Sequence, residues 1–341
     1  MQMKISASCK AALLALTMTV TLPILTARAE ETTVRIAQQF GLSYLPLHVA
    51  IDQKLIEKQA KALGLDGVKV EVATIASGAA VNDALISGSV DIAMAGSTVL
   101  LNLWDKTVGR DVIKGVMAIA DTPIYFNTID PRIKSVGDLT DQDRVAMTAG
   151  KGTQHALVLQ MAAAQAFGWD QRKKLDDLTV SMSHPDGVAA LLSGGAIVKT
   201  HATTVPFIQM ELADPRVRTI LNSYDVVGGR HTLIVAYARQ SWFTKNPKLY
   251  EATYRGLSEA IDIINADKAA AAALFVRAGK TSLSQEKVLA ILSDENMIAF
   301  TATPSRVMPF ADYMVKNGML KNKPASWTDI FFPNVHGLKG S

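Results

Sequence analysis

Short polar runs follow several apolar segments of this 341-residue sequence, and they contain side chains suited to binding a small molecule. The runs are rich in Gly, Ser, Thr, Gln and His, and none contains Asp or Glu. The candidate binding residues within them are Ser43, Tyr44, Ser77, Gly78, Ala79, Ser97, Thr98, Thr122, Thr153, Gln154, His155, His184, Thr203 and Thr204. Such groups beside helix N-termini favour a ligand with an anionic end, because the first backbone N–H groups of a helix carry part of a positive charge.

Each single run also has a structural interpretation. Ser, Thr and Gly cap helices in proteins of every class. His155 could equally be a solvated surface residue, and His201 could point into the core. The binding hypothesis therefore depends on the runs meeting at one place. If His184 pairs with an anion as an imidazolium, affinity should fall as the pH rises through ~6.5.

The sequence contains no signature of a metal centre or of a familiar catalytic motif. The six His residues show no paired spacing of the HExxH kind, so we expect no metal site and no cofactor. Neither a GxSxG elbow nor a GxxxxGK[ST] phosphate loop is present. We expect a protein that is not an enzyme, although distant residues could still assemble a nucleophile and a base.

The first 29 residues carry the pattern of a secretory signal peptide. Lys4 and Lys10 flank the start of an apolar run from Ala11 to Leu25, and Ala27 and Ala29 form a small-residue cleavage site. The run is shorter than the ~20 apolar residues of a membrane-spanning helix. We expect export to a bacterial periplasm and cleavage after Ala29.

Cleavage changes the composition of the exported protein. The whole chain has a formal net charge of +4, but loss of Lys4, Lys10 and Arg28 leaves 32 basic and 31 acidic side chains, a net charge of +1. This balance argues against a nucleic-acid or membrane-surface binder, which needs a dense basic stripe. The only cysteine, Cys9, is removed and precedes the apolar run, so we expect neither a lipoprotein nor disulfides.

The rest of the chain alternates between strand and helix patterns, which predicts an α/β fold. Strands are predicted at 34–39, 68–73, 90–95, 144–148, 178–183, 197–201, 217–221 and 232–238. Helices are predicted after most of them, among them 154–167 and one that begins at His184. Strands that alternate with helices form mostly parallel sheets covered on both faces.

The length predicts two domains, and no low-complexity linker separates them. We expect two lobes, each a mostly parallel sheet flanked by helices. Residues 30–130 and 231–341 would form lobe 1, with a helical C-terminal part, and residues 131–230 would form lobe 2. The chain would cross between them near 129–135 and 227–232. Ligands of open sheets bind beyond the carboxyl ends of the strands, so the candidate residues should line the cleft between the lobes.

Three segments resemble a known family. They are Tyr44-Leu45-Pro46 before a predicted helix, residues 83–93 (DALISGSVDIA) and residues 135–139 (SVGDL). Their order and spacing resemble the nitrate/sulfonate/taurine group of ABC-transporter solute-binding proteins, and the similarity extends from Val34 to about Phe332. The resemblance implies the type II periplasmic-binding fold and delivery of a small solute to the permease subunits of an ABC transporter.

The resemblance also assigns pocket loops position by position. The matching loops are residues 42–44, 77–79, 96–98, 153–155 and 204–207. Many relatives carry an aromatic residue and an acid just before the Pro of the last loop, where this chain has Thr204 and Val205. Family ligands include small anions, zwitterions such as taurine and neutral pyrimidines. The missing acid disfavours a ligand with an amino group.

Three classes of function stay open. The first is a monomeric periplasmic receptor for a small anionic solute, organic or inorganic, such as a sulfonate, nitrate or a carboxylate. The second is a periplasmic enzyme on the same scaffold; the relatives of this fold that make a pyrimidine precursor of thiamine use a Cys-rich motif, which the exported chain lacks. The third is a ligand-sensing module for a membrane receptor, for which the sequence shows no anchor.

Overall fold

The structure is a computed structural model that describes residues 30–150, 152–194, 197–278 and 281–341. The predicted signal peptide, residues 1–29, lies outside the described residues. Within the described ranges, no helix combines the length and apolarity that a membrane crossing requires.

Two sheets organise the described chain. The strands of the larger sheet are β1 (Thr33–Gln38), β2 (Lys69–Thr74), β3 (Ile92–Gly96), β4 (Ile113–Asp121), β10 (Thr232–Arg239) and β11 (Ala299–Phe300). Those of the smaller sheet are β5 (Tyr125–Thr128), β6 (Val145–Met147), β7 (Thr179–Ser181), β8 (Thr200–Thr203) and β9 (Arg218–Asn222). Their orders are β11-β4-β10-β3-β1-β2 and β7-β6-β8-β5-β9.

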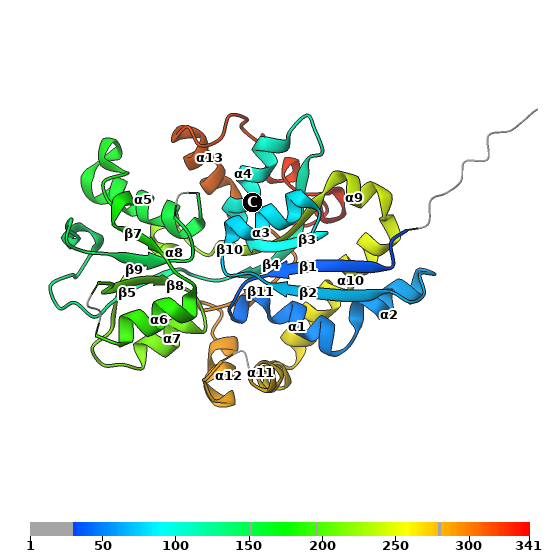
Figure 1. Ribbon diagram of the computed structural model, residues 1–341, viewed down its shortest axis with the longest axis horizontal. Coiled ribbons are helices and arrows are strands. Elements are labelled where there is room, and N and C mark those ends of the chain that lie inside the picture. The colour runs from blue at the N-terminus through cyan, green and yellow to red at the C-terminus, as the bar shows by residue number, and fades with distance from the viewer. Residues whose placement is uncertain (1–29, 151, 195–196, 279–280) are drawn as a thin grey trace, which may run out of the picture.

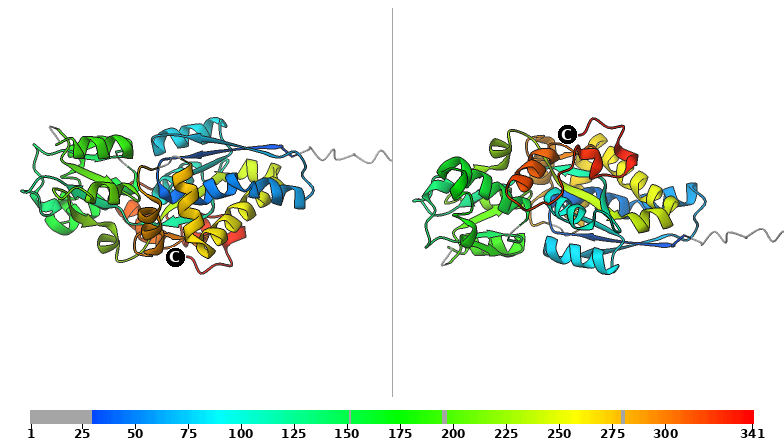
Figure 2. Two further views of the ribbon diagram at one scale, coloured as in Figure 1. Left: turned by 90° about the horizontal axis from the view of Figure 1, so that it is seen from below. Right: turned by 90° about the horizontal axis from the view of Figure 1, so that it is seen from above.

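Helices surround both sheets and make two lobes that lie side by side along the longest axis (Figures 1 and 2). With the larger sheet are α1 (Leu45–Asp52), α2 (Leu55–Ala62), α3 (Gly78–Ser87), α4 (Ser97–Thr107), α9 (Gln240–Lys245), α10 (Pro247–Ala266), α11 (Lys268–Arg277), α12 (Gln285–Ser293) and α13 (Val307–Lys316). With the smaller sheet are α5 (Gln154–Phe167), α6 (His184–Leu192), α7 (Phe207–Leu212) and α8 (Ser223–Val227). The predicted α/β fold of two mostly parallel sheets flanked by helices is confirmed.

The apolar strand β10 lies in the middle of the larger sheet. It pairs antiparallel with β3 on one side and β4 on the other, with Val235 opposite both Ala95 and Ala118. Seven consecutive residues from Thr232 are buried. A central strand covered on both faces needs a continuous apolar sequence, which explains why this segment does not alternate.

The chain passes between the sheets at 122–124 and again at 228–231. The first passage comes earlier than the predicted 129–135, because Tyr125–Thr128 forms β5 and pairs antiparallel with both β8 and β9. Neither β4 nor β5 was among the predicted strands. β8 also begins three residues later than expected, at Thr200.

Hydroxyl side chains define where several helices begin. Ser77, Thr153 and Ser183 precede α3, α5 and α6, and each accepts a hydrogen bond from the backbone N–H three residues ahead. This bond satisfies one of the N–H groups that a helix leaves unpaired at its start. The caps therefore hold three helix N-termini at the edges where the strands end.

Candidate ligand-binding site

A cavity lies between the two lobes, where strands of both sheets end. The space between its walls, open solvent at the mouth included, is about 590 Å³. The larger lobe lines it with Gln39, Phe40, Ser43, Tyr44, Ala76, Gly78, Gly96, Val99, Leu233 and Ile234. The smaller lobe lines it with Thr148, Thr153, Gln154, His155, His184 and Thr204.

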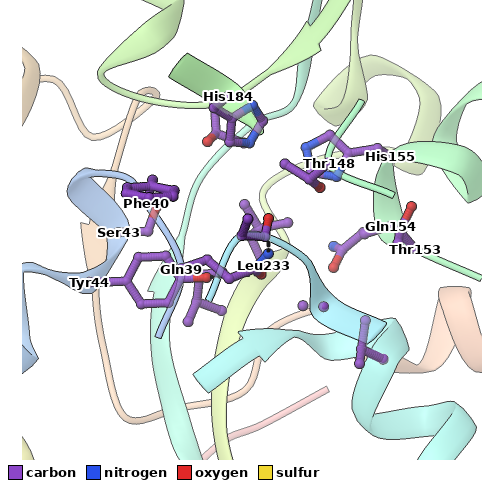
Figure 3. Close-up of a pocket in the computed structure, with 16 residues that line it drawn as sticks. Gln39, Phe40, Ser43, Tyr44, Thr148, Thr153, Gln154, His155, His184 and Leu233 are labelled. Carbon is purple, nitrogen blue, oxygen red and sulfur yellow. Dashed lines mark hydrogen bonds between the residues drawn. The ribbon is translucent and has the colours of Figure 1, made fainter. Parts of the chain in front are cut away.

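Many of the predicted binding residues meet at this cavity. They are Ser43, Tyr44, Gly78, Thr153, Gln154, His155, His184 and Thr204. Figure 3 shows Phe40, Ser43 and Tyr44 on one side, Thr153, Gln154 and His155 on the opposite side, and His184 beside the space between them.

The other predicted residues are not part of the cavity wall. They are Ser77, Ala79, Ser97, Thr98, Thr122 and Thr203. The Ser97 hydroxyl donates to Gln154 Oε1 over 3.0 Å, and the Thr98 hydroxyl donates to the Gly152 carbonyl over 3.2 Å. Thr122 donates to the Met297 carbonyl over 2.8 Å. The hydroxyl protons of Ser97, Thr98 and Thr122 are therefore used within the protein, whereas Thr203 Oγ1 is buried without a hydrogen-bond partner.

Gln154 differs from its expected role as a side-chain donor to the ligand. Its Nε2 donates to the Thr232 carbonyl over 3.1 Å and lies 3.0 Å from Nδ1 of His231, while its Oε1 accepts from Ser97. All its polar atoms are thus engaged within the protein. The side chain joins the smaller lobe to the larger lobe and to the second passage of the chain between them.

Two buried polar atoms of the cavity wall have no hydrogen-bond partner. They are Ser43 Oγ in the larger lobe and His155 Nε2 in the smaller lobe. Leaving such a group unpaired costs about 1–3 kcal/mol. A ligand that bonds to either atom would recover that free energy, so both atoms mark positions for polar contacts.

Four helices point their N-termini at the cavity. Gly78 begins α3, Gly96 precedes α4, Thr153 precedes α5, and His184 begins α6; all four residues line the wall. None of the lining residues in the described chain is Asp, Glu, Lys or Arg. Helix N-termini carry partial positive charge, so the empty cavity favours an anion although its wall has no Lys or Arg in the described chain.

A cluster of imidazoles extends from the cavity into the smaller lobe. The rings of His155 and His184 are 5.4 Å apart, and Nδ1 of His184 lies 3.2 Å from Nε2 of His201. Burial lowers the pKa of His155 to about 3 and holds the pKa of His184 well below its ordinary value, with neighbouring imidazoles adding to both effects. Burial thus favours the neutral form of both rings in the empty cavity. An imidazolium at His184 in the anion-bound protein stays a prediction.

Several lining residues were not predicted. Gln39, Phe40 and Thr148 follow β1 and β6 directly, so a search that began at the last strand residue would have found them. Leu233 and Ile234 lie at the start of β10, and nothing in a buried apolar strand indicates contact with a ligand. Glu211, which is fully buried behind His201, likewise left no sequence signal.

Comparison with known proteins agrees with this architecture. A sequence model of the NMT1-like family matches residues 27–277. A search of curated protein sequences gives no match. One similar structure is the alkanesulfonate-binding protein SsuA from Xanthomonas axonopodis pv. citri bound to MOPS, with a TM-score of 0.66 and 19% identity over 86% of this chain and 96% of that chain. Another is the periplasmic nitrate-binding protein NrtA from Synechocystis PCC 6803, with a TM-score of 0.68 and 17% identity over 88% of this chain and 84% of that chain.

A third is the periplasmic aliphatic sulphonate-binding protein SsuA from Escherichia coli, with a TM-score of 0.64 and 20% identity over 89% of this chain and 92% of that chain. At identities this low, the structural similarity establishes a shared fold and nothing more specific. The type II periplasmic-binding fold implied by the sequence resemblance is thereby confirmed.

Proposed function

The chain belongs to the NMT1-like family, and on that premise we propose that it is the periplasmic solute receptor of an ABC importer. It binds a small anionic solute reversibly between its lobes and delivers it to membrane permease subunits. It acts as a monomer and catalyses no reaction on the solute.

The observation that carries this proposal is the cavity itself. Four helix N-termini converge on a space whose described wall has no charged side chain, and Ser43 and His155 each offer a buried polar atom without a partner. Such a site compensates the charge of an anion with dipoles and neutral donors. Phe40, Val99 and Leu233 add apolar surface, which suits an anionic group on a small organic body.

The enzyme alternative lacks support at this cavity. Ser43 is the only Ser among the lining residues that the structure describes, and its hydroxyl contacts neither imidazole. A Ser nucleophile needs a base within hydrogen-bond reach. Incubation with a bound solute should therefore return the solute unchanged.

Calorimetry and thermal-shift measurements with matched ligands test the anion. Ethanesulfonate, nitrate and propionate should be compared with their uncharged or cationic counterparts, propanol, propionamide and propylamine. Anions should raise the melting temperature, and the counterparts should not. A preference for propylamine or propionamide would overturn the anionic solute while leaving the receptor role in place.

Export and oligomeric state are tested by mass. We propose that the periplasmic form begins at Glu30, after cleavage at Ala29. Intact mass spectrometry of periplasmic protein should show that N-terminus, and a retained Met1 or a lipid adduct would contradict it. Native mass spectrometry of the same sample should show a monomer and the mass of any co-purified solute.

A further inference from the structure

A chain of hydrogen bonds leads from the cavity to a buried carboxylate. Nδ1 of His184 lies 3.2 Å from Nε2 of His201, and Nδ1 of His201 lies 2.5 Å from Oε1 of Glu211. The other carboxylate oxygen accepts a hydrogen bond of 2.9 Å from the amide of Asn127. His201, Glu211 and Asn127 have no exposed surface, whereas His184 lines the cavity.

The outer partners of this chain limit where its protons can lie. Thr219 donates its hydroxyl to Asn127 Oδ1 over 2.8 Å, so the Asn127 amide nitrogen faces Glu211 and donates to it. The roles of the two imidazoles depend on their tautomers. In the arrangement that gives both carboxylate oxygens of Glu211 a donor, His201 holds its proton on Nδ1 and its Nε2 accepts from Nδ1–H of His184. Nε2 of His184 then carries a lone pair and no proton.

The groups that face these imidazoles come from α5, α7, β5 and β8. His155 from α5 and Phe207 from α7 lie against His184, with ring centroids 5.4 and 5.2 Å away. His201 from β8 contacts Glu211 from α7, and the Asn127 amide from β5 is the remaining partner of that carboxylate. Burial keeps the pKa of His184 well below its ordinary value and that of His155 near 3 in the empty cavity.

We propose that the cavity binds its anion together with one proton, and that Glu211 and His201 are positioning residues for that proton. This inference rests on the proposed function. The proton comes from solvent and adds to the Nε2 lone pair of His184, and no bond of the anion breaks. The new Nε2–H is a charge-assisted donor for the anion. The proton on Nδ1 can shift to Nε2 of His201, which places the positive charge beside Glu211.

The sign of the pH dependence follows from this uptake. A bound anion favours the charged imidazolium and raises the pKa of His184 above its low value in the empty cavity. Between those two pKa values, affinity should rise by about tenfold for each unit that the pH falls. Below the pKa of the empty state, affinity should level off, because both states then hold the proton.

Calorimetry can measure how many protons the protein takes up when an anion binds. Ethanesulfonate, with nitrate as a second probe, should be titrated into the protein at pH 7 in buffers that differ in ionisation enthalpy. Both anions stay ionised at this pH, so any proton taken up belongs to the protein. The expected uptake is about one proton per bound anion. Binding without uptake would overturn this inference but not the proposed function; failure of every anion tested would overturn both.

A matched pair of variants tests the positioning residues. Glu211→Gln keeps the shape of the side chain but removes its charge, so proton uptake and the pH slope should both be lost. Asp214→Asn removes a carboxylate two residues beyond α7, where it pairs with Arg216 at the surface, and should retain both. A Glu211→Gln protein with undiminished uptake would refute the role of Glu211.

Nitrogen-15 NMR of the empty wild-type protein provides a test that does not depend on the variants folding. His184 should show a neutral ring with an unprotonated Nε2. A proton on Nε2 in the empty protein would contradict the proposed arrangement.

Discussion

Ser43 and Gln154 both line the cavity, yet their side chains are in opposite situations. The hydroxyl of Ser43 is buried without a partner, whereas each polar atom of Gln154 is hydrogen-bonded within the protein. A buried polar group without a partner lowers the stability of the empty protein, whereas a fully bonded group supports it. Variants at the two positions should therefore separate ligand recognition from structural support.

Replacing Ser43 with Ala should weaken anion binding by about tenfold, since one hydrogen bond to a charged group is lost. The melting temperature of the empty protein should stay the same or rise, because the change removes a buried hydroxyl that has no partner there. Calorimetry and differential scanning fluorimetry measure the two effects. Ser77→Ala is the control: its hydroxyl caps α3, so it should lower the melting temperature instead. Unchanged affinity in Ser43→Ala would place the anion elsewhere in the cavity.

Replacing Gln154 with Ala should destabilise the empty protein. The change leaves buried groups of Ser97 and His231 with one partner fewer, at a cost of about 1–3 kcal/mol. The melting temperature of the ligand-free protein should fall by several degrees. The retention of wild-type melting together with weaker binding would instead indicate that the amide serves the ligand.

At the scale of elements, α6 is the helix that carries His184, and Gly187 sets how closely it packs. A Cβ on Gly187 would lie 2.5 Å from Nε2 of His201, which is closer than real contacts allow. Only the absence of a side chain lets α6 approach β8 so that His184 and His201 can bond. The position of one imidazole thus depends on a glycine one turn away.

Replacing Gly187 with Ala should lower stability, although Gly-to-Ala changes in helices ordinarily raise it by about 0.5–1 kcal/mol. The loss of stability, in place of the usual gain, would come from displacement of the His201 ring. Thermal melting of the ligand-free protein measures it, and Ala189→Gly at an exposed position of the same helix calibrates the intrinsic preference. A rise in melting temperature for Gly187→Ala would show that α6 can move without cost.

At the scale of the whole molecule, the two lobes contact each other on both sides of the cavity. On one side the backbone N–H of Leu42 donates to the Val205 carbonyl over 3.1 Å. On the other side Thr98 and Asn102 both donate to the Gly152 carbonyl. Further links are the bonds of Gln154 with Ser97 and Thr232 and those of Asn317 with Arg172 and Gln160.

We predict that the ligand-free protein in solution is more open than this arrangement. Many of the contacts between the lobes are hydrogen bonds that water can replace, and two-lobed proteins close by hinge motion. Small-angle scattering should show a smaller radius of gyration with saturating ethanesulfonate than without it. Equal radii despite proven binding would contradict hinge closure.

The junction between the lobes should also make stability depend on pH. Asp121 ends β4 and accepts a hydrogen bond of 2.7 Å from Thr232 at the start of β10. Burial raises the pKa of Asp121 to about 6, well above the value of an unfolded chain. The folded state therefore binds the proton more tightly, and the stability this contributes is present below pH ~4 and lost as the pH rises through about 6.

Replacing Asp121 with Asn should remove the loss of stability that accompanies a rise in pH through about 6. Melting temperatures between pH 4 and 7 should show a smaller decline for Asp121→Asn than for the wild type, and Asp66→Asn at an exposed position should follow the wild type. An identical decline in Asp121→Asn would assign the dependence to other groups.

Patterns within a few residues were sufficient to predict many of the elements and much of the cavity. The helix at 154–167 was predicted with its observed bounds, because Thr153 caps its start and Gly168 follows its end. Loops that follow strands and begin helices are polar for local reasons, so Ser43, Gly78, His155 and Thr204 were recognised from their neighbours in the chain. Their arrival at one cavity also required the sheets that the alternation of strands and helices implied.

Only the tertiary structure decided what these side chains contact. Gln154 is bonded to Ser97, His231 and Thr232, which are distant in sequence, so no local pattern could distinguish it from a free donor. Leu233 reaches the cavity because β10 is placed between β3 and β4. Glu211 reaches His201 because folding brings α7 beside the sheet that contains β8. Periodicity and capping are properties of neighbouring residues, whereas pairing, burial and proton position depend on segments that folding alone brings together.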